Sequence, residues 1–150
     1  MRSGAAGNSE AHRLSECPLG LYEKALPQME WPGILAKAKE LGFDFVEMSI
    51  DESDERLARL DWSRQKRKEF AGAVLESGLR VPSVCLSGNR RYPLGSSDSA
   101  TAEAGAALIR KGVDLAVDLG IRIIQLAGYD VYYDEPSTPE TKERFAVALG

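Results

Sequence analysis

The chain has 150 residues, of which 43% are hydrophobic, and a formal net charge of −4 at pH 7. This length fits one globular domain or part of a larger one. The acidic balance excludes a broad surface for nucleic acid or for anionic membranes, but it leaves room for a small anion pocket. No apolar stretch approaches the roughly 18 residues of a membrane span. Cys17 and Cys85 lie far apart and fit no metal or redox spacing, so we interpret them as reduced thiols of a cytoplasmic protein.

Residues 1–16 are small, polar and without periodicity. They lack the apolar segment of a secretory signal, and we predict a disordered N-terminal extension. His12 is the only histidine in the sequence and lies in this segment. We interpret it as a solvated tail residue, which leaves residues 17–150 without the commonest transition-metal ligand.

Strands and helices are predicted to alternate from residue 18 onward. Gly42, Gly78 and Gly120 each follow a helical stretch and precede an apolar run, as expected where a left-handed glycine ends a helix. The acidic residues 51–55 and the polar residues 87–97 are predicted loops. The predicted strands are 18–22, 43–49, 81–86 and 121–126. The first predicted helix is 31–41, and the second ends at residue 77 and is capped by Asp61 or Ser63. The third is 99–119 with Asp98 as its cap, and the fourth begins near Pro139.

Four such strand–helix units predict either an open doubly wound sheet or part of a (β/α)₈ barrel. The open sheet fits the chain length, but no loop carries GxGxxG or GxxxxGK[ST], the usual phosphate cradles of nucleotide-binding sheets. A whole barrel needs about 250 residues. The chain length therefore favours the open sheet, whereas the missing phosphate motifs argue against it.

Side-chain alternation sorts the second strand into two faces. Val46, Met48 and Ile50 form an apolar face suited to pack under helices, and Glu47 then points to the opposite face. In a barrel this places Glu47 near the C-terminal mouth, where it can meet Ser87 and Gln125. Such a group can hydrogen-bond the hydroxyl and carbonyl groups of a sugar. The alternative is that these are only polar residues at strand ends, with Glu47 paired to a nearby Arg or Lys.

The loops at the same rim carry further candidates. Arg90 and Arg91 are adjacent and could clamp a phosphate, or they could form surface ion pairs. Tyr129, with Tyr132 and Tyr133, could wall a sugar pocket or pack its own loop.

Four segments resemble the L-ribulose-5-phosphate 3-epimerase family, whose members are also described as L-xylulose-5-phosphate 3-epimerases or hexulose-6-phosphate isomerases of the ascorbate and pentulose pathways. The resemblance covers about residues 18–150. It departs at Asn89, where His is expected in many relatives. The segments are LGLYEKALP (19–27), LGFDFVEMSIDESDERLARLDWS (41–63), VPSVCLSGNRRYPLGS (81–96) and GIRIIQLAGYDVYYDE (120–135).

The resemblance implies that residues 17–150 are the N-terminal half, four βα units, of a xylose-isomerase-like (β/α)₈ TIM barrel. It implies removal of the C3 proton of a ketose phosphate next to the C2 carbonyl, and return of a proton on the opposite face. A divalent metal would stabilise the enediolate. In the family the metal ligands and the acid/base glutamates come from strands five to eight, so none is assigned to this sequence. We therefore expect this truncated chain alone neither to bind the catalytic metal nor to epimerise.

What the resemblance assigns to this chain is the substrate side of the rim. The expected partner is a small sugar phosphate, not nucleic acid or a membrane, and unpaired edge strands allow a homo-oligomer. The other reading from the residues is a non-catalytic four-stranded open-sheet module that binds a phosphorylated ligand or a partner protein. The assigned substrate-binding residues are Glu47, Ser49, Ser87, Arg90, Arg91, Gln125 and Tyr129.

Overall fold

The computed structural model describes residues 17–150, so the expectations for residues 1–16 and His12 lie outside it. None of the helices in residues 17–150 combines the length and the apolar character that crossing a bilayer requires. The strands are β1 (Gly20–Tyr22), β2 (Phe45–Ser49), β3 (Ser83–Leu86) and β4 (Ile123–Leu126). The helices are α2 (Trp31–Glu40), α3 (Asp54–Leu57), α4 (Arg64–Ser77), α5 (Ser99–Leu119) and α6 (Pro139–Leu149), with 3₁₀ turns η1 (Glu23–Ala25), η2 (Ala58–Asp61) and η3 (Ser87–Arg91).

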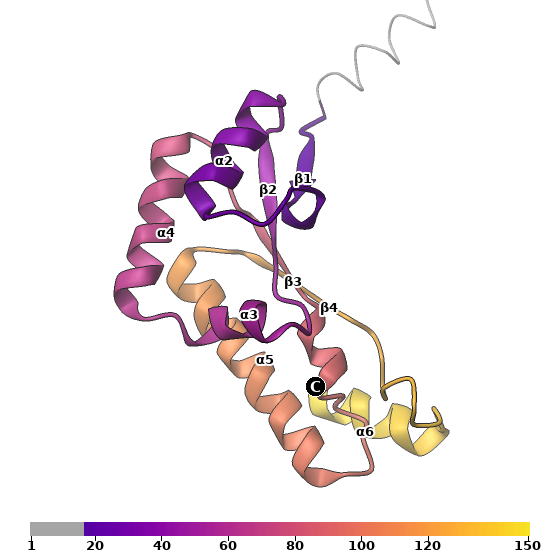
Figure 1. Cartoon of the computed structure of the whole chain (residues 1–150). Coiled ribbons are helices and arrows are strands. Elements are labelled where there is room, and N and C mark those ends of the chain that lie inside the picture. The colour runs from indigo at the N-terminus through magenta and orange to yellow at the C-terminus, as the bar shows by residue number, and fades with distance from the viewer. Residues whose placement is uncertain (1–16) are drawn as a thin grey trace, which may run out of the picture.

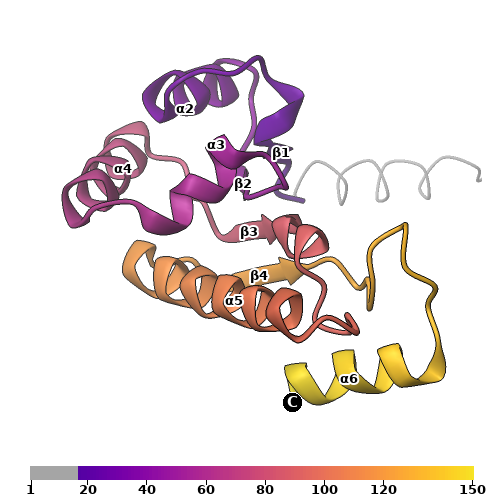
Figure 2. The same cartoon turned by 60° about the horizontal axis from the view of Figure 1, so that its bottom comes forward.

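The four strands form one parallel sheet in the order β1-β2-β3-β4 (Figure 1). Helices α2, α4 and α5 lie along one side of the strands (Figure 2). A doubly wound sheet reverses its strand order and carries helices on both faces. Strictly sequential order with helices outside is instead the wall of a βα barrel. The open doubly wound sheet is therefore wrong as the fold, and the described strands form part of a barrel wall.

The core lies between the sheet and the helices. Val46, Met48 and Ile50 are each 0% exposed, which confirms the apolar face predicted for β2. Leu86 of β3 and Leu115 of α5 continue this layer. The opposite, inner face of the sheet is much less covered by residues 17–150, and Ile123 on β4 is 58% exposed there.

All four strands end where the sequence predicts, but each begins two residues later than expected. For β2 and β4 the reason lies in the end of the preceding helix. The amide of Phe43 donates to Ala38 O at 3.0 Å, and that of Ile121 donates to Ala116 O at 2.8 Å. These residues therefore still close the preceding helix and are not free to join the sheet. The glycines that follow α2, α4 and α5 have positive φ, as predicted: Gly42 (84°), Gly78 (74°) and Gly120 (70°).

Two segments predicted as loops contain regular turns. The short helix α3 begins inside the acidic segment because Ser53 Oγ accepts the Arg56 amide at its start. The 3₁₀ turn η3 occupies the first five residues of the predicted polar loop 87–97. Of the two caps considered for α4, Ser63 is the one that accepts a backbone amide, whereas Asp61 pairs with Lys111 at 2.6 Å. Asp98 caps α5 as predicted.

Helix α5 approaches the loop after η3 so closely that only glycine fits at position 105. A Cβ on Gly105 would lie 2.1 Å from Tyr92 O.

We expect Gly105→Ala to lower the free energy of unfolding by about 2 kcal/mol, because α5 or the loop must move. Gly72 is also inside a helix, but a Cβ there meets nothing within 4 Å. Gly72→Ala should raise stability by about 0.5–1 kcal/mol through helix propensity. Urea denaturation measures both, and equal effects would contradict the close approach.

Candidate substrate-binding rim

The candidate site is the rim formed by the C-terminal ends of β1–β4 and the residues that follow them, because parallel strands direct these ends to one edge. The register aligns Ser49 with Cys85, and Cys85 with Gln125. These three residues thus form one layer on the inner face of the sheet. Of the predicted site residues, Ser49 and Gln125 are brought to the same level, with Ser49 buried and Gln125 exposed.

Tyr22 closes this layer on the β1 side. Its hydroxyl and Ser49 Oγ are 2.8 Å apart and share a hydrogen bond. Burial raises the pKa of Tyr22, although the bond with Ser49 opposes this. The phenol therefore stays protonated at neutral pH and can donate a hydrogen bond. Tyr22 was not among the site residues predicted from sequence, although its position at the end of a predicted strand was an available signal.

Glu47 lies one layer below the rim. Its carboxylate accepts a hydrogen bond from Ser83 Oγ at 2.8 Å, and neither side chain is exposed. Ser87 comes four residues after Ser83, at the start of η3, so the two are separated along the strand direction. The structure therefore does not bring Glu47, Ser87 and Gln125 to one level as the sequence indicated.

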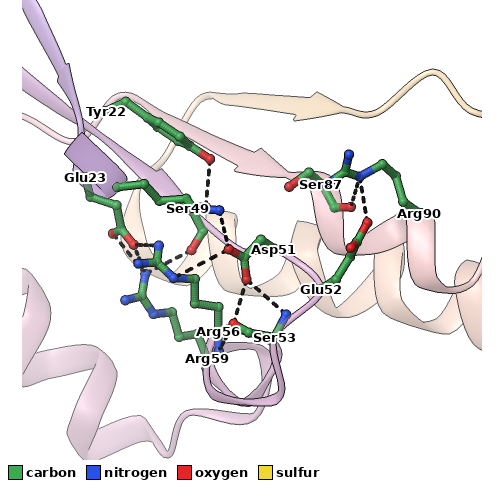
Figure 3. Close-up of polar contacts among 11 residues, drawn as sticks. Tyr22, Glu23, Ser49, Asp51, Glu52, Ser53, Arg56, Arg59, Ser87 and Arg90 are labelled. Carbon is green, nitrogen blue, oxygen red and sulfur yellow. Dashed lines mark hydrogen bonds and ion pairs between the residues drawn. The ribbon is translucent and has the colours of Figure 1, made fainter. Parts of the chain in front are cut away.

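A buried ion-pair cluster joins the ends of β1 and β2 to α3 and η2. Glu23 is 2% exposed, and its carboxylate accepts hydrogen bonds from Arg56 and from Arg59 Nη1, the latter at 2.6 and 2.9 Å (Figure 3). Arg59 Nη1 also donates to Ser49 O at 2.9 Å. Burial raises the pKa of Glu23 despite the two arginines. No local pattern in the sequence pointed to this pairing.

Arg59 is fixed by aromatic rings as well. Its guanidinium carbon lies 5.6 Å from the ring centre of Trp31 and 6.0 Å from that of Trp62. Trp31 begins α2 and Trp62 precedes α4, so cation–π contacts tie both helix starts to the rim.

Asp51 organises the loop after β2. It accepts hydrogen bonds from Lys24 Nζ at 2.6 Å and from both the amide and the hydroxyl of Ser53. Burial opposes ionisation, but these hydrogen bonds outweigh it and hold the pKa of Asp51 well below its usual range. The loop thus carries a fixed negative charge and a fixed shape at neutral pH.

Arg90 connects three loops of the rim. Its Nε lies 2.8 Å from Glu52 Oε1 in the loop after β2, and Nη1 lies 3.5 Å from the Tyr133 hydroxyl in the loop after β4. The guanidinium carbon is 5.8 Å from the Tyr129 ring centre. Nε also donates to Ser87 O at 3.4 Å within η3. Arg90, Ser87 and Tyr129 are therefore together at the rim.

Arg91 pairs with a different carboxylate from the one that Arg90 contacts. It forms an ion pair with Asp54 and donates to Glu52 O at 3.2 Å. It also lines a surface pocket of about 380 Å³ with residues that include Tyr132 and Glu135. The two arginines are adjacent in sequence but do not point to one acceptor in this structure.

Asn89 is 1% exposed and joins the turn after β3 to the end of β4. Its amide nitrogen donates to Ala127 O at 2.9 Å, and its amide oxygen accepts from Ala127 N at 3.2 Å. Both polar ends of the side chain are thus used by the backbone. This gives Asn89 a structural task in holding the rim.

Residues 17–150 do not fit a metal centre, since no three His, Cys, Asp or Glu side chains in this part of the chain come together as ligands. The rim has hydroxyl, amide and guanidinium groups, with single carboxylates paired to the arginines. Its chemistry is that of hydrogen bonding to hydroxyl groups and of pairing with an anion.

A family model described as xylose isomerase-like TIM barrel matches residues 35–150. The chain belongs to this family. The L-ribulose-5-phosphate 3-epimerase UlaE of Escherichia coli O157:H7 is 59% identical over 135 residues, which are 89% of this chain and 47% of that protein. The chain thus spans about half the length of the curated relatives it matches. The resemblance to this epimerase family is confirmed.

Solved structures of sugar epimerases are similar to the fold of this chain. A D-psicose 3-epimerase from Clostridium cellulolyticum H10 with D-tagatose matches with a TM-score of 0.72 at 16% identity, over 89% of this chain and 46% of that one. An L-ribulose 3-epimerase matches with a TM-score of 0.62 at 26% identity, over 87% and 43%. Both matches cover less than half of the solved epimerase chain, as expected for four of eight βα units. The predicted fold class is confirmed.

The Glu23 ion pair should be important for stability. Glu23→Gln leaves Arg56 and Arg59 without their buried carboxylate, and we expect it to lower the free energy of unfolding by about 2–4 kcal/mol. Glu40→Gln removes the same charge from the exposed pair with Lys37 and should cost less than about 0.5 kcal/mol. Urea denaturation of both variants checks this, and similar costs would show that the buried pair does not stabilise the rim.

Proposed function

We propose that this chain supplies the substrate-binding side of a sugar-phosphate 3-epimerase that interconverts L-ribulose 5-phosphate and L-xylulose 5-phosphate. The observation that supports it most is the 59% identity to an L-ribulose-5-phosphate 3-epimerase over nearly the whole described chain. The rim adds groups of suitable chemistry at the edge where barrels of this type bind ligands.

The reaction inverts C3 by taking its proton and returning one on the other face, and the neighbouring C2 carbonyl acidifies that proton. A divalent metal would stabilise the developing oxyanion in such a reaction. Residues 17–150 do not fit a metal, so we assign no step of this chemistry to them. Their proposed task is to bind and orient the substrate, which lowers the entropic cost of reaching the reactive geometry.

The polar residues divide into two parts of the proposed site. Ser49 and Gln125, in one layer across the sheet, would hydrogen-bond sugar hydroxyl groups, with Glu47 supporting the layer from below. Ser87 and Arg90 at the start of β3's loop, with Tyr129 beside them, would hold the phosphate end. Arg91 would add positive charge from its more exposed position. A homo-oligomer and a cytoplasmic location stay predictions.

We expect the 150-residue chain alone to give no turnover of L-ribulose 5-phosphate, because residues 17–150 offer no set of metal ligands. A chimera that joins residues 17–150 to the second half of the E. coli relative should epimerise it. The measurement is formation of L-xylulose 5-phosphate with a divalent metal present. Turnover by the chain alone would contradict the assignment, and so would a folded chimera that binds metal but is inactive.

The two arginines should differ in the same chimera. Arg90→Gln should raise KM for L-ribulose 5-phosphate at least tenfold, the order expected for losing one charge-assisted contact, and should leave KM for free L-ribulose nearly unchanged. Arg91→Gln removes the same charge from an exposed pair with Asp54 and should change KM less than about threefold. Equal losses for the phosphorylated and free sugars would exclude phosphate binding by Arg90.

A further inference from the structure

The guanidinium group assigned above to phosphate already holds an anion. Glu52 Oε1 lies 2.8 Å from Arg90 Nε, and the two side chains are 30% and 28% exposed. This oxygen is buried, and within residues 17–150 it makes no hydrogen bond of good geometry. The charge of Arg90 is therefore what stabilises it. Figure 3 shows Glu52 and Arg90 facing each other across the rim, from the loops after β2 and β3.

Carboxylate and phosphate oxygens bind the guanidinium group in the same way. An incoming phosphate cannot approach Arg90 Nε without meeting the Glu52 carboxylate, because like charges at this distance repel. The backbone of the loop that carries Glu52 is held in place, because the preceding Asp51 accepts hydrogen bonds from Lys24 and Ser53. The carboxylate is thus held at the place where an anion would bind.

We propose that Glu52 is an affinity-determining residue: its carboxylate competes internally for Arg90 and exchanges with the phosphate monoester of the substrate. This rests on the proposed function, which places phosphate at Arg90. A dianionic phosphate displaces the single charge of Glu52, whereas the neutral hydroxyl of a free sugar does not. The competition therefore lowers the affinity for the phosphorylated sugar and leaves that for a free sugar, which brings no anion to Arg90, nearly unchanged.

The neighbouring pair supplies a matched comparison. Asp54 is 90% exposed and its partner Arg91 is 42% exposed, so solvent screens this pair strongly. Glu52 and Asp54 lie two residues apart in the same acidic segment, and replacing either by its amide removes one negative charge. Only the Glu52 change should unmask Arg90.

The experiment titrates inorganic phosphate into the 150-residue chain and follows the Arg90 Nε–H and the ring resonances of Tyr129 and Tyr133 by NMR. We expect Glu52→Gln to bind phosphate roughly tenfold more tightly than the wild type, the effect of removing one adjacent unit charge at a partly buried site. Asp54→Asn should change the affinity less than about twofold. Dispersed amide spectra of each variant confirm that the fold is retained.

Arg90→Gln separates failure of this inference from failure of the proposed function. Loss of phosphate binding in Arg90→Gln, together with tighter binding in Glu52→Gln alone, supports the exchange. Equal tightening in Glu52→Gln and Asp54→Asn overturns it, because net charge alone then explains the effect. Undiminished phosphate binding in Arg90→Gln would show that Arg90 does not bind phosphate, and would contradict that part of the proposed function. No binding by the wild type or by Glu52→Gln at millimolar phosphate also overturns the exchange.

Discussion

The rim depends on one guanidinium group. Arg59 donates to the buried Glu23 at the end of β1 and to Ser49 O at the end of β2, and it lies against Trp31 and Trp62. A single side chain thus fixes two strand ends and the starts of two helices. Burial of Glu23 is costly for a carboxylate, and the structure offsets this with two arginines. Because Ser49 is held through its backbone, its hydroxyl is free to bond Tyr22 and to face the inner side of the sheet.

A second arginine acts differently. Arg90 links loops, and its contacts with Glu52, Tyr133 and Tyr129 are partly exposed. Partly exposed ion pairs are weak and exchangeable, whereas buried ones are structural. The rim therefore combines a rigid part near β1 and β2 with an adaptable part near β3 and β4. The adaptable part is where an anionic ligand can exchange with protein carboxylates without disturbing the core.

Much of the fold could be predicted from local pattern. The apolar alternation of Val46, Met48 and Ile50 and the glycine helix ends depend on neighbours in sequence, and both were right. The starts of β2 and β4 were predicted too early because Phe43 and Ile121, which follow the glycines, still bond to the preceding helix. Strand order, which decided between sheet and barrel, is a long-range property. So is the pairing of Glu23 with partners 33 and 36 residues away, and no local pattern contains it.

For the predicted site residues, too, the sequence pattern predicted local features but not long-range contacts. Parity placed Glu47 on the correct face, but its depth depends on the register between β2 and β3, which puts it beside Ser83 and below the rim. Adjacency of Arg90 and Arg91 suggested one clamp, yet consecutive residues in a 3₁₀ turn point in different directions. Each arginine found a different carboxylate in the acidic segment. That segment, predicted from sequence only as a loop, supplies the negative charges that pair with the arginines of the rim. It therefore determines how exposed the positive charge of Arg90 is to a ligand.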